Sequence, residues 1–215
     1  MSATQDSSNS RGAAFRASFR ARIEAPVAAI FIRTHLTPNM LTLIGFGIAV
    51  LGAYLVAIHA WILAGLVVGF GAAFDLFDGA LARATGKSSK FGAFMDSTFD
   101  RAGEAVVYVG LVVAMIRLSD ANGAALAAAA MAAAFMVSYS RAKSESLGFS
   151  SGKGIANVGL APREVRSVIL VIGLIGAAID VRVLIAAVAL IAILATVTTI
   201  QRILFVYEQS KQRTN

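Results

Sequence analysis

The sequence predicts an all-α integral membrane protein with six transmembrane helices, preceded by an amphipathic helix that lies in the membrane interface. Hydrophobic residues make up 58% of the 215 residues, and apolar stretches long enough to cross a bilayer recur between residues 41 and 206. Polar turns that contain glycine, proline or clustered charge separate these stretches. The first ten residues are polar, so no cleavable signal peptide is expected.

The part of the chain before the first span divides into a tail and a helix. Residues 1–10 are rich in serine and asparagine, which is typical of a disordered tail. In residues 11–34, Phe15 and Phe19 lie four residues apart, with arginines beside them. This spacing predicts an interfacial helix whose arginines meet lipid phosphates. The six-helix transmembrane domain is expected over residues 35–215.

Turn signals delimit the six spans. Thr37 and Pro38 suit a helix cap and a first helical residue, which predicts a first span over residues 39–58. Trp61 is an interfacial anchor for the second span, which ends inside an acidic stretch. The remaining spans are predicted at residues 91–117, at 124–147, from 162 to a turn at 180–182, and at 183–206.

The positive charges predict how the bundle is oriented in the membrane. All lysines and arginines except Arg117 and Arg182 fall at one end of the predicted bundle, and such an excess marks the cytoplasmic side. We therefore expect a multi-pass protein of the cell membrane, with both termini and the acidic stretch in the cytoplasm. The net charge of +7 indicates anionic lipid or phosphorylated substrate and no nucleic-acid partner, because the basic residues are distributed between apolar spans.

Four aspartates give the strongest functional signal. Asp75 and Asp78 are three residues apart, and Asp96 and Asp100 are four apart, so each pair shares one face of a helix. Carboxylates at membrane depth need cations or water as partners. The chain has no cysteine and only two histidines, so oxygen must hold any metal, which favours one or two Mg²⁺ or Mn²⁺ ions. One or two of the aspartates alone would be read as solvated helix ends paired with lysine or arginine.

Written as a pattern, this stretch is Asp75-x2-Asp78-Gly79-x2-Ala82-Arg83-x8-Gly92-x3-Asp96-x3-Asp100. The pattern resembles, at every position, the signature of the CDP-alcohol phosphotransferases, which are membrane enzymes of phospholipid synthesis. The resemblance implies transfer of a phosphoryl-linked alcohol from a CDP donor to an acceptor hydroxyl, with release of CMP. It also implies a homodimer.

The same resemblance assigns roles to individual residues. It makes Asp75, Asp78 and Asp96 metal ligands, and Asp100 both a contact of the second metal and the base for the acceptor hydroxyl. Spacing alone does not separate ligand from base. The CDP donor would contact six residues, some of them small enough to let a nucleotide approach the backbone and others able to reach phosphate oxygens. These residues are Asp78, Gly79, Ala82, Arg83, Ser89 and Gly92.

A second group of basic residues predicts an acceptor that is itself phosphorylated. Arg163 and Arg166 begin the fifth span, where the helix dipole also favours an anion. Arg141 and Lys143 close the fourth span, and Arg202 lies near the end of the sixth. The group resembles the phosphatidylinositol phosphate synthase branch, which joins CDP-diacylglycerol to inositol phosphate. The chain departs from that branch in the order of arginine and lysine at its first two positions, and the two side chains are not equivalent.

Other functions remain open at this point. The same reaction could use glycerol 3-phosphate or another alcohol as acceptor, or an archaeal-type ether lipid. A divalent cation transporter would use the aspartates as an ion path, but it should carry acidic residues along the depth of the bundle. A structural membrane protein would leave the aspartates unexplained, and the basic residues alone would then mark cytoplasmic helix ends.

Overall fold

The computed structural model describes residues 37–84, 89–149 and 158–214, with side chains described outside residues 75–84 and 213–214. The predicted tail (1–10) and interfacial helix (11–34) lie outside these ranges. Within them the chain is helical, with no strand. The helices are α2 (Pro38–Ala57), α3 (Trp61–Ala84), α4 (Lys90–Arg117), α5 (Ala121–Ser146), α6 (Arg163–Gly176) and α7 (Val181–Thr214).

Side chains accept hydrogen bonds from early N–H groups at the starts of α2 and α5. Thr37 Oγ1 accepts a hydrogen bond from Met40 N at 3.3 Å, and Pro38 occupies the first turn of α2, as predicted. At the start of α5, Asp120 Oδ1 accepts from Gly123 N at 2.8 Å. The predicted boundaries are therefore close to the observed ones at these two helices.

Each predicted span corresponds to a helix, but only some of these helices meet the length and hydropathy needed to cross a membrane. Among the described residues, three helices are long and apolar enough to cross a membrane: Pro38–Ala57, Ala121–Ser146 and Val181–Gln212. Helix α6 has 14 residues and is about 21 Å long, shorter than the roughly 30 Å hydrocarbon core of a bilayer. Helix α7 continues beyond the predicted end at residue 206 to Thr214.

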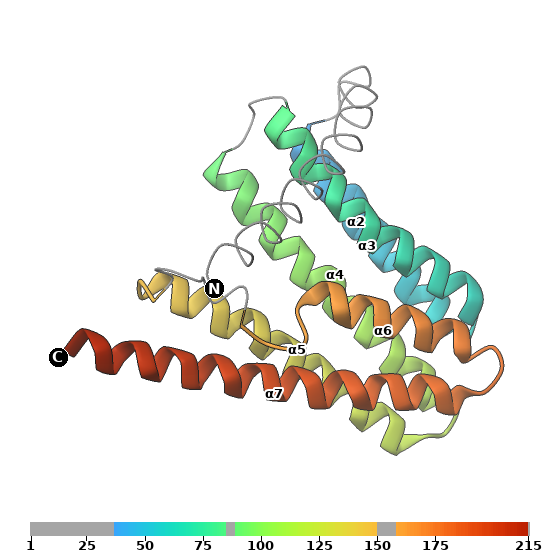
Figure 1. Cartoon of the computed structure of the whole chain (residues 1–215). Coiled ribbons are helices and arrows are strands. Elements are labelled where there is room, and N and C mark those ends of the chain that lie inside the picture. The colour runs from blue at the N-terminus through green and yellow to red at the C-terminus, as the bar shows by residue number, and fades with distance from the viewer. Residues whose placement is uncertain (1–36, 85–88, 150–157, 215) are drawn as a thin grey trace, which may run out of the picture.

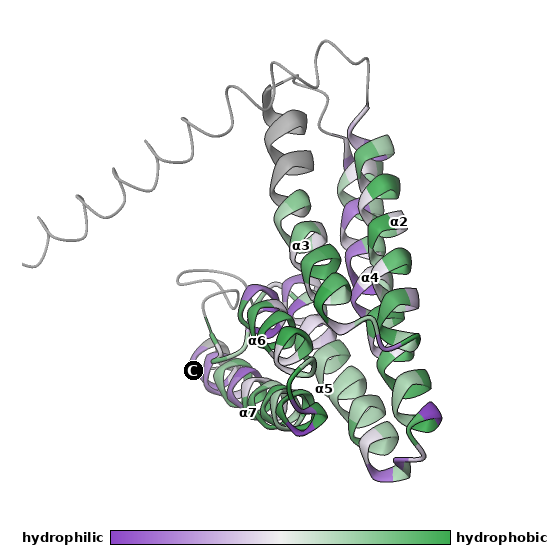
Figure 2. Ribbon diagram, turned by 90° about the vertical axis from the view of Figure 1, so that its right-hand side faces the viewer, coloured by the Kyte–Doolittle hydropathy of each residue, from purple (hydrophilic) through white to green (hydrophobic). Residues whose placement is uncertain are grey.

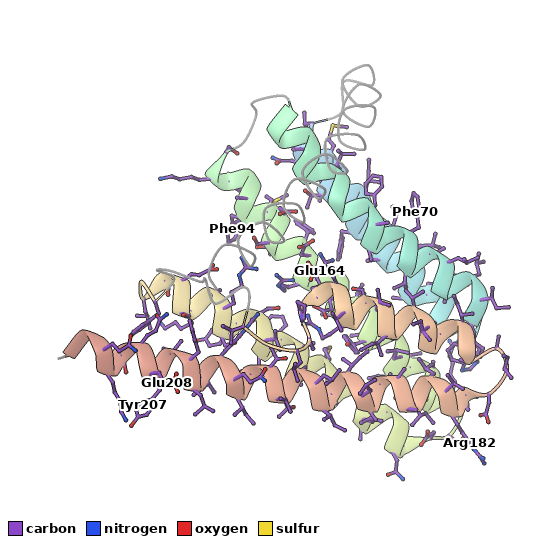
Figure 3. The ribbon with its side chains drawn as sticks, viewed as in Figure 1. Phe70, Phe94, Glu164, Arg182, Tyr207 and Glu208 are labelled. Atoms are coloured by element: carbon purple, nitrogen blue, oxygen red, sulfur yellow. The ribbon has the colours of Figure 1, made fainter. Side chains whose placement is uncertain are left out.

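The helices pack in a closed ring whose order differs from their order in the chain. The pairs in extensive contact follow the sequence α2, α3, α6, α7, α5, α4 and back to α2. Helices α2 and α3 run side by side and lie at an oblique angle to α7 (Figure 1). Apolar residues dominate α2 and α3, whereas polar residues are prominent along α4 (Figure 2). Large apolar side chains such as Phe70 and Phe94 project outward, where a membrane protein meets lipid (Figure 3).

The contact between α2 and α4 depends on a glycine. A Cβ added at Gly110 would lie 2.5 Å from the carbonyl oxygen of Ala53 and 3.0 Å from its Cα. These are backbone atoms, so the neighbouring helix has to move to make room. Small residues at helix contacts permit this close approach in membrane proteins. The same helix α2 carries Gly47, where an added Cβ would meet nothing within 4 Å.

Gly110→Ala is expected to lower the thermal unfolding midpoint of the protein in detergent. Overpacking a close helix contact costs about 1–3 kcal/mol, which exceeds the gain of up to about 1 kcal/mol from the better helix propensity of alanine. Gly47→Ala is the matched control, and it should leave the midpoint unchanged or raise it. A midpoint for Gly110→Ala equal to or above that of the wild type would show that α2 and α4 are not in this contact.

Candidate active site

The two predicted aspartate pairs lie on neighbouring stretches of helix. Asp75 and Asp78 fall in the last turns of α3, and Asp96 and Asp100 fall in the first three turns of α4. The side chains of the first pair lie outside the described part of the structure. So do those of the predicted donor contacts Gly79, Ala82 and Arg83. Convergence of the four carboxylates therefore stays a prediction, and no cluster of three or more metal-binding side chains occurs among those described.

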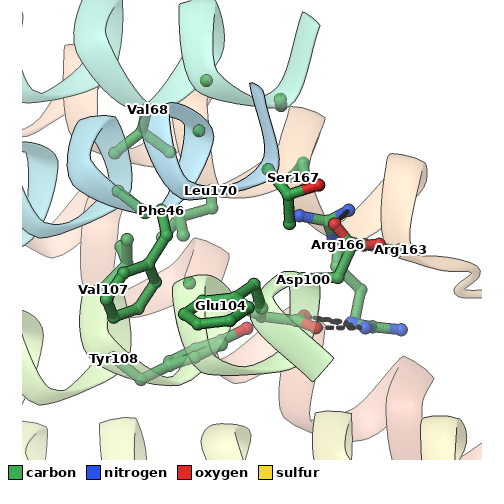
Figure 4. Close-up of a pocket in the computed structure, with 17 residues that line it drawn as sticks. Phe46, Val68, Asp100, Glu104, Val107, Tyr108, Arg163, Arg166, Ser167 and Leu170 are labelled. Atoms are coloured by element: carbon green, nitrogen blue, oxygen red, sulfur yellow. Dashed lines mark hydrogen bonds and ion pairs between the residues drawn. The ribbon is translucent and has the colours of Figure 1, made fainter. Parts of the chain in front are cut away.

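A cavity of about 70 Å³ lies beside Asp100, between α2, α3, α4 and α6 (Figure 4). Its polar side is formed by α4 and α6 and its apolar side includes Phe46 of α2 and Val68 of α3. The polar lining consists of Asp100, Glu104, Tyr108, Arg163, Arg166 and Ser167, together with Thr42. Carboxylates and guanidinium groups thus lie together on one side of the cavity, and most of the remaining lining is apolar.

Two ion pairs join α4 to α6 at this wall. Arg163 Nη1 lies 2.9 Å from Asp100 Oδ1, and these side chains are 25% and 21% exposed. One turn deeper, Arg166 donates from Nε to Glu104 Oε1 and from Nη2 to Oε2, both at 2.9 Å. The Arg166 side chain is 1% exposed. Arg163 of the outer pair is therefore accessible to a ligand, whereas Arg166 of the inner pair is buried in a two-pronged contact with Glu104, which is 16% exposed.

The predicted acceptor residues occupy different environments. Arg163 and Arg166 line the cavity. Arg141 and Lys143 are exposed on the last turns of α5, where Arg141 Nε donates to Glu145 Oε1 at 2.9 Å. Neither of these two residues is among those that line the cavity.

Arg202 is buried between α5 and α7. It is 4% exposed, donates from Nε to the carbonyl of Val158 at 3.0 Å, and donates from Nη1 to the carbonyl of Val137. These bonds tie α7 to α5 and to the segment that precedes α6. Contact of Arg202 with an acceptor phosphate stays a prediction, because its described hydrogen bonds are to backbone carbonyls.

Ser89 and Gly92 begin α4. Ser89 Oγ accepts a hydrogen bond from Gly92 N at 2.9 Å and so caps the helix. A Cβ added at Gly92 would lie 3.1 Å from that hydroxyl oxygen and 3.4 Å from Asn39 Oδ1. Both residues thus have a local structural role, and their contact with the donor stays a prediction.

Sequence reasoning missed Glu104, which lies at the polar wall of the cavity. The available signal was its spacing, because Glu104 follows Asp100 by four residues and Asp96 by eight, on one face of a largely apolar helix. An ionisable residue inside a predicted span indicates a buried partner or a functional site. The partner is Arg166, which lies 62 residues further along the chain.

Comparison with known proteins places this geometry in context. The family model described as CDP-alcohol phosphatidyltransferase matches residues 35–204. The archaetidylinositol phosphate synthase of Pyrococcus horikoshii is 40% identical over 177 residues, which are 82% of this chain and 85% of that protein. The phosphatidylinositol phosphate synthase of Cutibacterium acnes is 39% identical over 147 residues, which are 66% of this chain and 69% of that protein.

Solved structures of the Mycobacterium tuberculosis phosphatidylinositol phosphate synthase share this fold. The crystal structure with CDP-DAG bound matches with a TM-score of 0.77 at 28% identity, covering 86% of this chain and 94% of that one. The structure of the same enzyme in complex with manganese and citrate matches with a TM-score of 0.75 at 28% identity, covering 86% and 88%.

Proposed function

Because the chain belongs to the CDP-alcohol phosphatidyltransferase family, we propose that it transfers a phosphatidyl group from CDP-diacylglycerol to a hydroxyl of an inositol phosphate and releases CMP. The family match confirms the resemblance indicated by the aspartate motif, and the protein is an enzyme of this class. One observation in the structure supports an acceptor that carries a phosphate, and the inositol is proposed from the names of the relatives. A carboxylate predicted to act as base, Asp100, faces a cation suited to phosphate, Arg163, across 2.9 Å at a cavity wall.

This arrangement suits a hydroxyl that is carried by a phosphorylated molecule. Arg163 can release Asp100 and pair with the acceptor phosphate instead, since both side chains are partly exposed. The freed Asp100 carboxylate can then take the proton of the acceptor hydroxyl. The hydroxyl oxygen forms a bond to the phosphatidyl phosphorus, the bond from that phosphorus to the bridging pyrophosphate oxygen breaks, and CMP leaves with the bond electrons.

Residues Asp75, Asp78, Asp96 and Asp100 would hold the metal. Their hard carboxylate oxygens fit Mg²⁺ or Mn²⁺, and the two described ones, Asp96 and Asp100, are partly accessible on one face of α4. The bound ion supplies positive charge that offsets the negative charge developing on the leaving CMP. Asp96 and Asp100 lie in the first three turns of α4, so we expect the reaction to occur near one membrane surface.

We also propose the finer topology indicated by the sequence. Six alternating spans would place the aspartates and both termini on the cytoplasmic side of the cell membrane, with membrane lipids around the bundle and a second copy of the chain as partner. Arg182, at the start of α7, lies at the opposite end of that helix from Glu208 (Figure 3). The distribution of positive charge between these two ends supports the orientation.

A second candidate keeps the reaction and changes the lipid. The relative from Pyrococcus horikoshii is an archaetidylinositol phosphate synthase, which favours an archaeal-type ether lipid in place of the diacylglycerol group. Other acceptors, including glycerol 3-phosphate, would also keep the reaction class. A divalent cation transporter is not favoured by any described contact.

Release of CMP from purified protein tests these proposals directly. With CDP-diacylglycerol and Mg²⁺ or Mn²⁺, we expect inositol 1-phosphate to support rapid release, whereas inositol and glycerol 3-phosphate should not. Inositol is the control for the phosphate, since it offers the same hydroxyls without the anion that Arg163 would bind. Faster release with glycerol 3-phosphate would overturn the acceptor assignment, and release with none of the acceptors would overturn the function.

A further inference from the structure

The buried pair of Glu104 and Arg166 has no part in the chemistry described so far. From its geometry we infer that Glu104 is a positioning residue: by holding Arg166 it sets where the start of α6, and hence Arg163, stands relative to Asp100. This inference rests on the proposed function, because it assigns a purpose to the placement of Arg163. It concerns a residue that touches neither substrate nor metal in the proposed reaction.

Each of the three guanidinium nitrogens of Arg166 donates to a protein group in the described structure. Its Nε and Nη2 donate to the two carboxylate oxygens of Glu104, and its Nη1 donates to the carbonyl of Ala161 at 2.8 Å. The Arg166 side chain is 1% exposed and the Glu104 side chain 16%, so a change of partner would leave the buried guanidinium of Arg166 without its anion. Breaking one side of such a pair is strongly unfavourable, so the inner pair stays closed while the outer pair can exchange.

The start of α6 depends on contacts with other helices. Pro162, at its N-cap, makes no side-chain capping hydrogen bond. Instead, the fully buried hydroxyl oxygen of Thr198 on α7 accepts hydrogen bonds from Leu160 N at 3.1 Å and Ala161 N at 3.0 Å. Arg166 holds the carbonyl of the same Ala161. The segment that leads into α6 is thus hydrogen-bonded to Thr198 of α7. Through Arg166 and Glu104 it is also linked to α4.

Gly159 shows how closely this segment lies against α7. Its φ is +120°, a conformation that favours glycine, and an added Cβ would meet the Thr198 side chain at 2.2 Å. The segment therefore has little freedom on the α7 side. On the α4 side, two ion pairs hold it: the partly exposed Asp100–Arg163 pair and the more deeply placed Glu104–Arg166 pair. The second has the less exposed cation, so we assign to it the control of the approach of α6 to α4.

Arg163 stands between the two fastened points. It follows Ala161, which precedes the helix, by two residues, and it shares the first turn of α6 with Arg166, three residues further on. Its partner Asp100 precedes Glu104 by four residues on α4. The two ion pairs therefore join the same two helices one turn apart. Movement at the Glu104–Arg166 pair would displace the guanidinium of Arg163 relative to Asp100.

A double-mutant cycle tests the inference. We would measure kcat and the KM of acceptor and donor for Glu104→Gln, Arg166→Gln and the double variant, with the thermal midpoint of each. Each single change is expected to raise the acceptor KM by about tenfold to a hundredfold, because small displacements of a binding group are enough for such losses. The donor KM should stay unchanged. The double variant should be no worse than either single, since both residues act through one contact.

Arg117→Gln is the matched control. Arg117 also makes an interhelical hydrogen bond from α4, donating to the carbonyl of Ala57 at 3.0 Å, but at the other end of the helix. Its loss should leave both KM values unchanged. If a single change at the buried pair prevents folding because it leaves a charge unpaired, the double variant still tests the inference, because it removes both charges.

Two outcomes would overturn the inference. In the first, Arg166→Gln raises the acceptor KM while Glu104→Gln does not, which would make Arg166 a direct ligand of the acceptor. In the second, the midpoint falls and both KM values stay at wild-type values, which would leave the pair a purely structural role.

A distance measurement between α4 and α6 tests the positioning of α6 independently of the proposed function. Because the chain has no cysteine, nitroxide labels can be placed at the exposed sites Phe94→Cys on α4 and Val168→Cys on α6. Glu104→Gln should shift or broaden the distance distribution between the labels, and Arg117→Gln should not. If the wild type released no CMP with any acceptor, the function would fail while this distance still reported on the positioning of α6; an unchanged distance in Glu104→Gln would overturn the positioning itself.

Discussion

Asp100→Asn is expected to lower the rate of CMP release by about 10²- to 10⁴-fold, the range typical of losing a general base. Asparagine keeps the size of the side chain and an oxygen that can accept from Arg163, but it cannot take the proton of the acceptor hydroxyl. Asp100 is partly exposed at the wall of the cavity, so the change should affect the reaction and leave the packing of α4 intact. Rates at saturating donor and acceptor measure the effect.

The same variant distinguishes the two roles predicted for Asp100, general base and metal ligand. The spacing of the aspartates in the sequence does not distinguish them. If Asp100 acts mainly as a ligand, raising the Mn²⁺ concentration should restore much of the rate of Asp100→Asn. If it acts as the base, the rate should stay low at any metal concentration. Asp120→Asn is the control, because Asp120 caps α5 at the other end of the bundle and asparagine caps equally well. Full turnover by Asp100→Asn would show that another group takes the proton.

The helices could be predicted because their signals are local. Apolar length and turn residues are read within a single stretch, as at Thr37 and Pro38, where the cap and the first turn of α2 agree with the prediction. The end of α7 was placed too early because hydropathy marks the apolar part of a helix. The helix continues to Thr214 through polar residues such as Gln209 and Lys211, which favour a helix without favouring a membrane.

The candidate site was predictable only as far as its motif extends. Eight positions within residues 75–100 identified the family, because their spacing is a local property of two neighbouring helices. The Glu104–Arg166 pair was not predictable in this way. Its members lie on α4 and α6, which α5 separates in the chain, and the ring order α2, α3, α6, α7, α5, α4 is set by packing between distant segments. The structure pairs Arg166 with Glu104, and its predicted contact with the acceptor phosphate stays a prediction.

Removing divalent metal with EDTA is expected to reduce CMP release by about 10³-fold or more. A bound metal stabilises the transition state by several kcal/mol, and each 1.4 kcal/mol or so is a factor of about ten in rate. Adding back Mg²⁺ or Mn²⁺ should restore the activity, because carboxylate oxygens bind both ions. Full activity after complete chelation would contradict the metal role of the aspartates.

Mn²⁺ binding provides a readout that does not depend on turnover. Asp78→Asn on α3 and Asp96→Asn on α4 should each weaken the Mn²⁺ affinity measured by electron paramagnetic resonance, although the two residues belong to different helices. Asp180→Asn is the control, since Asp180 Oδ1 accepts from Arg182 N at 2.8 Å in the turn before α7. Losses at both of the first two positions would support a metal centre built by both helices, because a site built on one helix would respond to only one of them. An affinity that falls for Asp78→Asn and not for Asp96→Asn would place the metal on α3 alone, and the acceptor base would then have to act without a metal beside it.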